Sequence, residues 1–393
     1  MKSRLFALFA VVLAILAAAL PPLSAFAVGS DERAAGLLSG VRVSPSVSAK
    51  SAVLAEVGSG EVLFEKNADE RLPMASTTKI MTALVALEHA APETVVTVPR
   101  EAVGIEGSSI YLFEGEQLTL EELLWALLLA SANDAAAAIA WGVAGGVEPF
   151  AALMNEKAAA LGLRDTHFVN PHGLDDPDHY TTARELAIIA RAALGNDLIR
   201  RMVATEKTTI PHNGTAGVRL LVNHNKLLRR YKGAIGVKTG YTRRSGRCLV
   251  SAAEREGVTL LAVTINAPSD WNDHAAMLNA GFAALTSVTL ASPGGIAAEV
   301  PAVGGVAGSV TVANTAFCRV TLPADHGQIT AAVELPRFVY APVGAGEAVG
   351  RVVWRMDGRT VAEVELLART DVPATPKKAG WFRRLRDRIF HRN

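Results

Sequence analysis

Cysteine is scarce in this 393-residue chain, which holds only Cys248 and Cys318. The two lie in segments that we assign below to different domains, so two buried free thiols are expected in place of a disulfide. The chain also lacks Cys-x-x-Cys and His-Glu-x-x-His motifs, and its nine histidines form no cluster with the spacing of metal ligands. These absences argue against a structural or catalytic metal, and no cofactor is expected.

A strong overall charge is also missing, because the formal net charge is +1. The charge is nevertheless distributed unevenly along the chain. Residues 1–27 contribute +2 through Lys2 and Arg4, and residues 377–393 hold seven Lys or Arg against Asp387, a net +6. The residues between these two ends therefore carry −7. A negative body argues against nucleic acid as a partner.

A long apolar run, Leu5 to Leu20, directly follows the two basic residues near the N-terminus. Two prolines end the run, and the small residues Ala25 and Ala27 come next. This order is typical of a secretory signal peptide that is cleaved after Ala27. An uncleaved membrane anchor is the alternative, because the run is of borderline length for spanning a bilayer. Both alternatives place the rest of the chain outside the cytoplasm.

The remaining chain is long enough, and apolar enough, for two domains. The stretch "SAVLAEVGSGEVLFEKN" predicts two alternating strands joined through Gly58 to Gly60 as a hairpin. Apolar spacing predicts a first helix over 76–88, and Thr119 with Glu122 forms a capping-box pattern that starts another helix ending near Ala130. Further helices are expected over 135–141, 149–161, 182–193 and 271–285.

Short apolar runs separated by glycine and charged turns then predict antiparallel strands in "GAIGVKTGYT", "RCLVSAAE" and "VTLLAVTINA". From about 287 to 370 no helix is expected, and Asp357-Gly358 marks a two-residue hairpin turn. That segment predicts a small all-β domain of the sandwich type. We therefore divide the chain into a signal peptide (1–27), a linker (28–40), a catalytic domain (41–288), a β-sandwich domain (289–371) and a basic tail (372–393).

The stretch "MASTTKIMTAL" carries the first chemical signal, because Ser76 and Lys79 stand three residues apart at the start of a predicted helix. That spacing puts both side chains on one face. A serine hydroxyl is a weak nucleophile until a base accepts its proton. A lysine with the reference pKa of about 10.4 serves as that base only where burial and a nearby cation lower its pKa. A dry site with a second positive charge is therefore expected.

Two further stretches supply matching parts. "SAN", Ser131 to Asn133, follows the helix that begins near Thr119, and "KTG", Lys238 to Gly240, lies in a predicted strand. Lys238 is the expected second cation, and Gly240 allows close approach of a substrate to the backbone. Each signal alone is weak, and a lone Ser-x-x-Lys is usually a helix start with a solvated lysine. The ordered set of three is the motif set of β-lactamases and penicillin-binding proteins.

With "NPHGL", the glycine-rich β segment and the basic aromatic tail, the sequence resembles the low-molecular-mass penicillin-binding proteins, the serine-type D-alanyl-D-alanine carboxypeptidases of peptidase family S11. The resemblance implies an α/β (α+β) β-lactamase/transpeptidase-like fold, in which helices flank an antiparallel sheet and an all-helical subdomain faces its edge strand. It also implies two partners, peptidoglycan pentapeptide stems as substrates and β-lactams as inhibitors.

The resemblance further implies a role for each motif residue. Ser76 attacks the carbonyl between two D-alanines, Lys79 is the general base, and Ser131 relays a proton to the leaving amine. The remaining roles are implied for the substrate-binding residues Asn133, Lys238, Thr239 and Gly240, of which Lys238 and Thr239 hold the terminal carboxylate, and for an oxyanion hole made by the backbone N–H groups of Ser76 and Tyr241.

Three alternatives stay open. A class A β-lactamase usually has Ser-Asp-Asn where this chain has Ala132, and no Glu-x-x-Leu-Asn stretch follows Ser131. A non-catalytic penicillin-binding sensor is disfavoured by the complete set of serines and lysines. A D,D-endopeptidase is not distinguished from a carboxypeptidase, because the shape of the cleft cannot be read from the sequence.

The C-terminal stretch "PKKAGWFRRLRDRIFHRN" places apolar residues on one helical face with arginines around it. It is too short and too charged to span a bilayer, so it predicts reversible binding to an anionic lipid surface. A disordered, solvated end is the alternative. The expected location is extracytoplasmic, either peripheral on the outer face of the cytoplasmic membrane or in the cell wall space.

Overall fold

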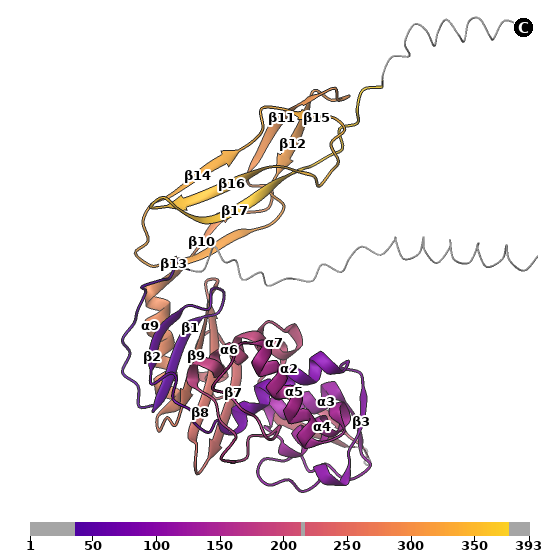
Figure 1. Ribbon diagram of the computed structural model, residues 1–393, viewed down its shortest axis with the longest axis vertical. Coiled ribbons are helices and arrows are strands. Elements are labelled where there is room, and N and C mark those ends of the chain that lie inside the picture. The colour runs from indigo at the N-terminus through magenta and orange to yellow at the C-terminus, as the bar shows by residue number, and fades with distance from the viewer. Residues whose placement is uncertain (1–35, 214–216, 377–393) are drawn as a thin grey trace, which may run out of the picture.

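The computed structural model describes residues 36–213 and 217–376, which form two bodies stacked end to end (Figure 1). The N-terminal body is built on a five-stranded antiparallel sheet in the order β2-β1-β9-β8-β7. Its strands are β1 (Ser51–Glu56), β2 (Val62–Lys66), β7 (Ala234–Thr242), β8 (Gly246–Arg255) and β9 (Val258–Ile265). Because β7 is an edge strand, one side of its backbone has no neighbouring strand in this sheet.

Helices cover both faces of this sheet. The helix α9 (Asp270–Ala284) lies on one face, and α6 (Ala183–Leu194) lies on the other (Figure 1). An all-helical subdomain continues from α6 past the edge strand. It comprises α2 (Lys79–His89), α3 (Leu120–Leu129), α4 (Asn133–Ala144), α5 (Val147–Ala160) and α7 (Asp197–Ala204). The predicted antiparallel sheet with flanking helices and an all-helical subdomain is thereby confirmed, whereas the predicted tail helix lies outside the described residues.

The predicted alternation of β1 is wrong, because all six of its residues are buried. Val53 and Ala55 belong to the apolar core shared with the helical subdomain, whereas Ala52 and Leu54 belong to the core under α9. A strand covered on both faces has no solvent side, which agrees with the continuous apolar run from Ala52 to Ala55.

The predicted capping box is confirmed at the start of α3. The Glu122 backbone N–H donates to Thr119 Oγ1, and the Thr119 backbone N–H donates to the Glu122 carboxylate. The expected helix over 135–141 begins earlier, at Asn133 in α4. Within the described part of the chain no single helix is long and apolar enough to cross a membrane, although α4 and α5 pass that test as a pair bent by 83°.

Shorter elements surround the subdomain. Two antiparallel pairs of strands lie here, β3 (Val95–Thr97) with β4 (Gln117–Thr119) and β5 (Lys207–His212) with β6 (Gly217–Val222). The short helix α8 (Leu227–Arg230) follows β6 and leads into β7. The loop between β6 and α8 therefore passes beside the sheet edge.

The C-terminal body is an all-β domain. A six-stranded sheet in the order β14-β16-β17-β12-β11-β15 accompanies the two-stranded sheet β10-β13. Its strands are β10 (Leu285–Ala291), β11 (Ala297–Val303), β12 (Ser309–Ala313), β13 (Cys318–Pro323), β14 (Ile329–Glu334), β15 (Val339–Tyr340), β16 (Ala348–Met356) and β17 (Arg359–Ala368). The predicted two-residue turn is confirmed, because Met356 pairs with Arg359 and both Asp357 and Gly358 have positive φ.

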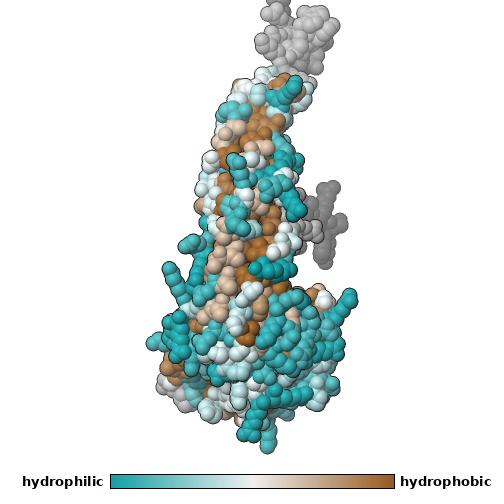
Figure 2. Space-filling view, turned by 90° about the vertical axis from the view of Figure 1, so that its left-hand side faces the viewer, coloured by the Kyte–Doolittle hydropathy of each residue, from teal (hydrophilic) through white to brown (hydrophobic). Residues whose placement is uncertain are grey.

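The surfaces of the two bodies differ. Figure 2 shows apolar residues gathered along the β domain and a largely hydrophilic surface over the N-terminal body.

The two cysteines are both free thiols. Cys248 is buried, as expected, whereas Cys318 is only partly buried, so the expectation of two buried thiols is wrong for Cys318. Cys318 begins β13 and lines a surface pocket together with Glu56 and Gly58, which leaves part of its side chain accessible.

Candidate active site

Ser76 lies in a tight turn against the edge of the sheet. It belongs to the 3-10 helix η1 (Ala75–Thr78), and the α-helix α2 starts only at Lys79, so the predicted helix start at Ser76 needs this correction. An ideal Cβ on Gly240 of β7 would lie 3.0 Å from Ser76 N. Gly240 therefore allows the turn that carries Ser76 to approach β7. The sequence assigned the close approach at Gly240 to a substrate, and that role stays a prediction.

The Lys79 side chain is fully buried and has three polar partners. Its Nζ lies 2.9 Å from Ser76 Oγ, 2.6 Å from Asn133 Oδ1 and 2.7 Å from the carbonyl oxygen of His172. Burial and then the charge of Lys238 hold the pKa of Lys79 well below its usual range, against a smaller opposing effect of Asp134. The expected dry site with a second cation is therefore present around this amine.

The Ser131 to Asn133 segment joins α3 to α4. Ser131 is buried and has a φ of 58°, which is uncommon for a serine, and it lines the same pocket as Ser76. Asn133 is the first residue of α4. Its amide donates to the Glu106 carbonyl oxygen at 2.5 Å and its oxygen accepts from Lys79. Both ends of the Asn133 amide thus have protein partners in this structure.

Lys238 lies behind the pocket wall. Its side chain is fully buried, its Nζ donates to the Thr239 carbonyl oxygen at 3.0 Å, and burial lowers its pKa to about 7. Thr239, Gly240 and Tyr241 line the pocket, but Lys238 does not. The charge of Lys238 therefore acts on Lys79, but the Lys238 amine is not part of the pocket surface.

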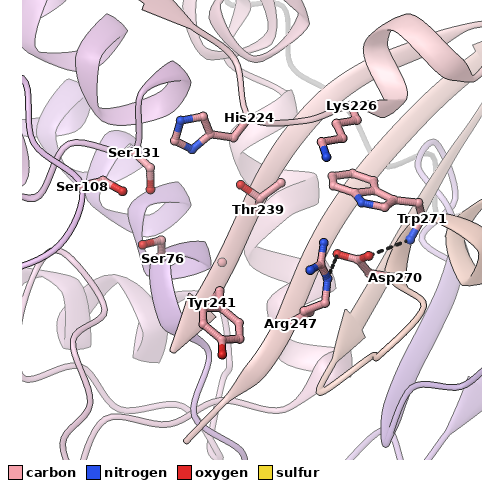
Figure 3. A pocket seen from close by; sticks show the side chains of 11 residues that line it. Ser76, Ser108, Ser131, His224, Lys226, Thr239, Tyr241, Arg247, Asp270 and Trp271 are labelled. Atoms are coloured by element: carbon pink, nitrogen blue, oxygen red, sulfur yellow. Dashed lines mark hydrogen bonds and ion pairs between the residues drawn. The ribbon is translucent and has the colours of Figure 1, made fainter. Parts of the chain in front are cut away.

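The pocket has a volume of about 430 Å³ and extends from Ser76 across β7 to the start of α9 (Figure 3). Sequence reasoning missed six residues that line it. These are Ser108, His224, Lys226, Arg247, Asp270 and Trp271. His172 of the "NPHGL" stretch is a further residue without a predicted role, and its main-chain oxygen accepts from Lys79.

Arg247 and Asp270 form an ion pair on the far side of this pocket. The Arg247 Nε donates to the Asp270 carboxylate at 3.1 Å, and the Asp270 side chain is buried while that of Arg247 is 46% exposed. Figure 3 shows the Arg247 guanidinium on the same side of β7 as Lys226 and Trp271. The pair leaves further guanidinium N–H groups available to a ligand.

A buried lysine beside a serine, a second serine across the pocket and an edge strand behind them define a serine–lysine acyl-transfer enzyme. The chain belongs to the D-alanyl-D-alanine carboxypeptidase family, whose model matches residues 40–269. Residues 286–374 match the model of the C-terminal domain of penicillin-binding protein 5.

Relatives support this membership over most of the chain. The chain is 33% identical over 343 residues to D-alanyl-D-alanine carboxypeptidase DacF of Bacillus subtilis, covering 85% of this chain and 87% of that protein. It is 30% identical over 373 residues to DacC of Escherichia coli, covering 88% of each. Among solved structures, penicillin-binding protein 5 from Haemophilus influenzae matches with a TM-score of 0.61 and 28% identity, over 84% of this chain and 99% of that one.

Proposed function

We propose that this protein is a penicillin-sensitive serine hydrolase that removes the terminal D-alanine from peptidoglycan pentapeptide stems through an acyl-enzyme on Ser76. Family membership supports the reaction class. The observation that carries the assignment of Ser76 is the fully buried Lys79 amine, 2.9 Å from Ser76 Oγ inside the pocket wall. Among the described residues, the other two hydrogen-bond partners of the Lys79 amine are an amide oxygen and a main-chain carbonyl oxygen, so Ser76 supplies the hydroxyl.

The partners of Lys79 suit a neutral amine. The Asn133 and His172 oxygens are obligate acceptors, so they take the two N–H groups of a neutral amine. A charged Lys79 donates to Ser76 Oγ, whereas in the neutral amine the lone pair faces this oxygen and the Ser76 hydroxyl becomes the donor. In the proposed step Ser76 Oγ attacks the scissile carbonyl carbon while its proton passes to Lys79.

The tetrahedral intermediate then needs donors for its oxyanion. We assign these to the backbone N–H groups of Ser76 and Tyr241, since the outer side of β7 has no neighbouring strand in its sheet. Ser131 lies in the pocket across from β7 and is assigned to pass a proton to the departing D-alanine amine. Water then attacks the ester on Ser76, which releases the shortened stem and restores the serine hydroxyl.

The terminal carboxylate of the substrate is assigned to the part of the pocket next to Thr239 and Arg247. Both residues line the pocket, and Asp270 orients the Arg247 guanidinium. Lys238, which the sequence pattern assigned to the same carboxylate, is buried behind Thr239. We therefore give Lys238 an electrostatic role, the lowering of the Lys79 pKa, and give the direct contact to Thr239 and Arg247.

Arg247→Gln is expected to lower kcat/KM on a peptide ending in free D-Ala-D-Ala by about 10- to 100-fold, because a charge-assisted hydrogen bond to the carboxylate is lost. The same substitution is expected to change the much lower rate on the C-terminal amide by less than threefold, since the amide offers no carboxylate. Steady-state kinetics on both peptides measure this. Arg244→Gln is the matched control, because Arg244 is exposed and does not line the pocket. Equal losses on both peptides would contradict the assignment.

The acylation rate is expected to fall as the pH is lowered, because Lys79 must be neutral to accept the serine proton. We call this falling part of the pH–rate profile the acid limb. Lys238 is charged below its pKa of about 7, and its charge helps to hold the pKa of Lys79 low. Lys238→Gln removes that charge, so the pKa of Lys79 rises and the acid limb moves to higher pH. Lys238→Arg keeps the charge, so the limb stays near its wild-type position. Rates of penicillin acylation between pH 5 and 9 measure both, and a limb unmoved in Lys238→Gln would contradict the electrostatic role.

Export and lipid binding remain predictions, because residues 1–27 and 377–393 lie outside the described residues. We propose that the mature protein works in the extracytoplasmic space and that its basic tail binds anionic lipid. The fold supports this proposal, because the last described residues of the β domain lie at the end of the molecule remote from β7, the strand that lines the pocket (Figure 1).

The proposed function is tested by mass spectrometry of a pentapeptide ending in D-Ala-D-Ala after incubation with the mature protein. Release of one D-alanine and formation of the tetrapeptide is the expected result. Cleavage of a cross-linked dimer in preference to the pentapeptide would identify an endopeptidase, and rapid turnover of penicillin would identify a β-lactamase. A stable penicillin adduct without cleavage of either peptide would identify a sensor.

A further inference from the structure

His179 lies outside the pocket but contacts the turn that carries Ser76. It is buried in the loop before α6, and its ring packs edge-on against Phe168 with ring centroids 5.6 Å apart. Neither the motif set nor the resemblance gave this histidine a role. Its two ring nitrogens have different partners, and these partners determine its tautomer.

The backbone N–H of Val169 donates to His179 Nδ1 at 3.2 Å. Nδ1 is therefore an acceptor and carries no proton. The proton of the neutral ring accordingly lies on Nε2, which is 2.8 Å from Thr78 Oγ1. The ring donates to the threonine hydroxyl, and burial lowers the pKa of His179 to about 4, in keeping with a neutral ring.

The Thr78 hydroxyl connects His179 to the main chain of Ala75. This hydroxyl donates to the Ala75 carbonyl oxygen at 2.8 Å. Ala75 has a φ of 48°, in the left-handed region that costs a non-glycine residue roughly 1 kcal/mol or more. The next residue is Ser76, so the direction of the Ala75 carbonyl fixes the peptide plane that carries the Ser76 N–H.

Gly173 closes the other side of the same carbonyl. It has a φ of 85°, and an added Cβ would overlap both the Ala75 carbonyl oxygen and Thr78 Oγ1. The preceding residue, His172, accepts a hydrogen bond from Lys79. The Ala75 carbonyl is thus held between the Gly173 backbone and a hydroxyl whose hydrogen bond His179 sets.

We propose that His179 is a positioning residue for acylation, which holds the strained Ala75–Ser76 peptide in place through the Thr78 hydroxyl. This inference rests on the proposed role of Ser76 as the nucleophile. In this proposal the buried loop before α6 orients two groups of Ser76. The hydroxyl is directed toward Lys79, and the backbone N–H is directed toward the oxyanion.

The test separates the acylation rate constant for penicillin from the affinity of the initial complex. His179→Phe removes the Nε2 donor and is expected to lower the acylation rate constant about 10- to 100-fold with less than a threefold change in affinity. His179→Gln keeps an N–H near the Nε2 position and is expected to stay within about fivefold of wild type. Thr78→Val and Thr78→Ser test the same contact from the hydroxyl side, and only Thr78→Val is expected to lower the acylation rate constant. This pair replaces the first one if His179→Phe does not fold.

A double variant distinguishes positioning from general destabilisation. In an Ala75→Gly background the left-handed conformation carries no Cβ penalty, so His179→Phe is expected to cost less than about threefold there. An equal cost in both backgrounds, or a lowered melting temperature with an unchanged acylation rate constant, overturns the proposal. Peptide mapping of the wild-type adduct is done first, because an adduct away from Ser76 would refute the proposed nucleophile and not the role of His179.

Discussion

Ser76→Ala is expected to abolish the covalent penicillin adduct completely. A β-lactam presents the same kind of carbonyl and carboxylate as D-Ala-D-Ala, so the same hydroxyl should attack it. The wild-type protein should gain the mass of one penicillin on Ser76 alone. The adduct should persist, because no deacylating glutamate is visible in the sequence and the ring-opened fragment does not leave as an amine would.

Intact-mass measurement and peptide mapping check this result, and the pocket offers a matched control. Ser108 also lines the pocket, but the hydrogen-bond partners of Lys79 among the described residues are Ser76, Asn133 and His172. Ser108→Ala should therefore still form the adduct at Ser76. An adduct that survives in Ser76→Ala, or one that is lost only in Ser108→Ala, would mean that the nucleophile has been misassigned.

The elements with strong local signals were predictable from the sequence. The capping box at Thr119 fixes the start of α3, because the two reciprocal bonds involve residues only three apart. The Asp357-Gly358 turn was predictable for the same reason, since both residues of this tight hairpin need positive φ. Such signals depend on neighbours in the chain and not on the tertiary fold.

The prediction failed where tertiary packing sets the local structure. The turn at Ser76 is a 3-10 helix because Met74 to Ser76 packs against Gly240, a contact between segments far apart in the sequence. The alternation expected for β1 is absent because two separate cores cover its two faces. The contact of the Ser76 turn with Gly240 leaves no trace in the local sequence, and the burial of both faces of β1 shows only as the apolar run from Ala52 to Ala55.

The pocket residues outside the motifs were unpredictable for a similar reason. Arg247 on β8 and Asp270 at the start of α9 meet only because the sheet and its covering helix converge. His172 contributes a backbone oxygen, and a main-chain group carries no signature in the side-chain sequence. The loop that carries His224 and Lys226 does have a local explanation. Asn223 and Asn225 are buried, and their side-chain oxygens accept from the backbone N–H groups of Asn225 and Leu227. The residues that alternate with these asparagines, His224 and Lys226, are exposed and line the pocket.

Lys79→Arg is expected to lower the penicillin acylation rate by about a thousandfold, within the range of roughly 10² to 10⁴ that general-base catalysis contributes. Arginine keeps the positive charge but is not deprotonated in a protein, so it has no lone pair for the Ser76 proton. It is also larger than lysine, in a fully buried space with three close partners.

Lys79→Met separates the two possible roles of this lysine. Methionine fills a similar volume without charge or base, so both variants should lose acylation if Lys79 is the base. If Lys79 served only as a local cation, Lys79→Arg would retain much of the rate and Lys79→Met alone would lose it. Melting temperatures identify a loss caused by misfolding, and intact-mass time courses with penicillin measure the rates. Acylation of a folded Lys79→Arg protein at close to the wild-type rate would falsify the base role, because a permanently protonated side chain accepts no proton from Ser76.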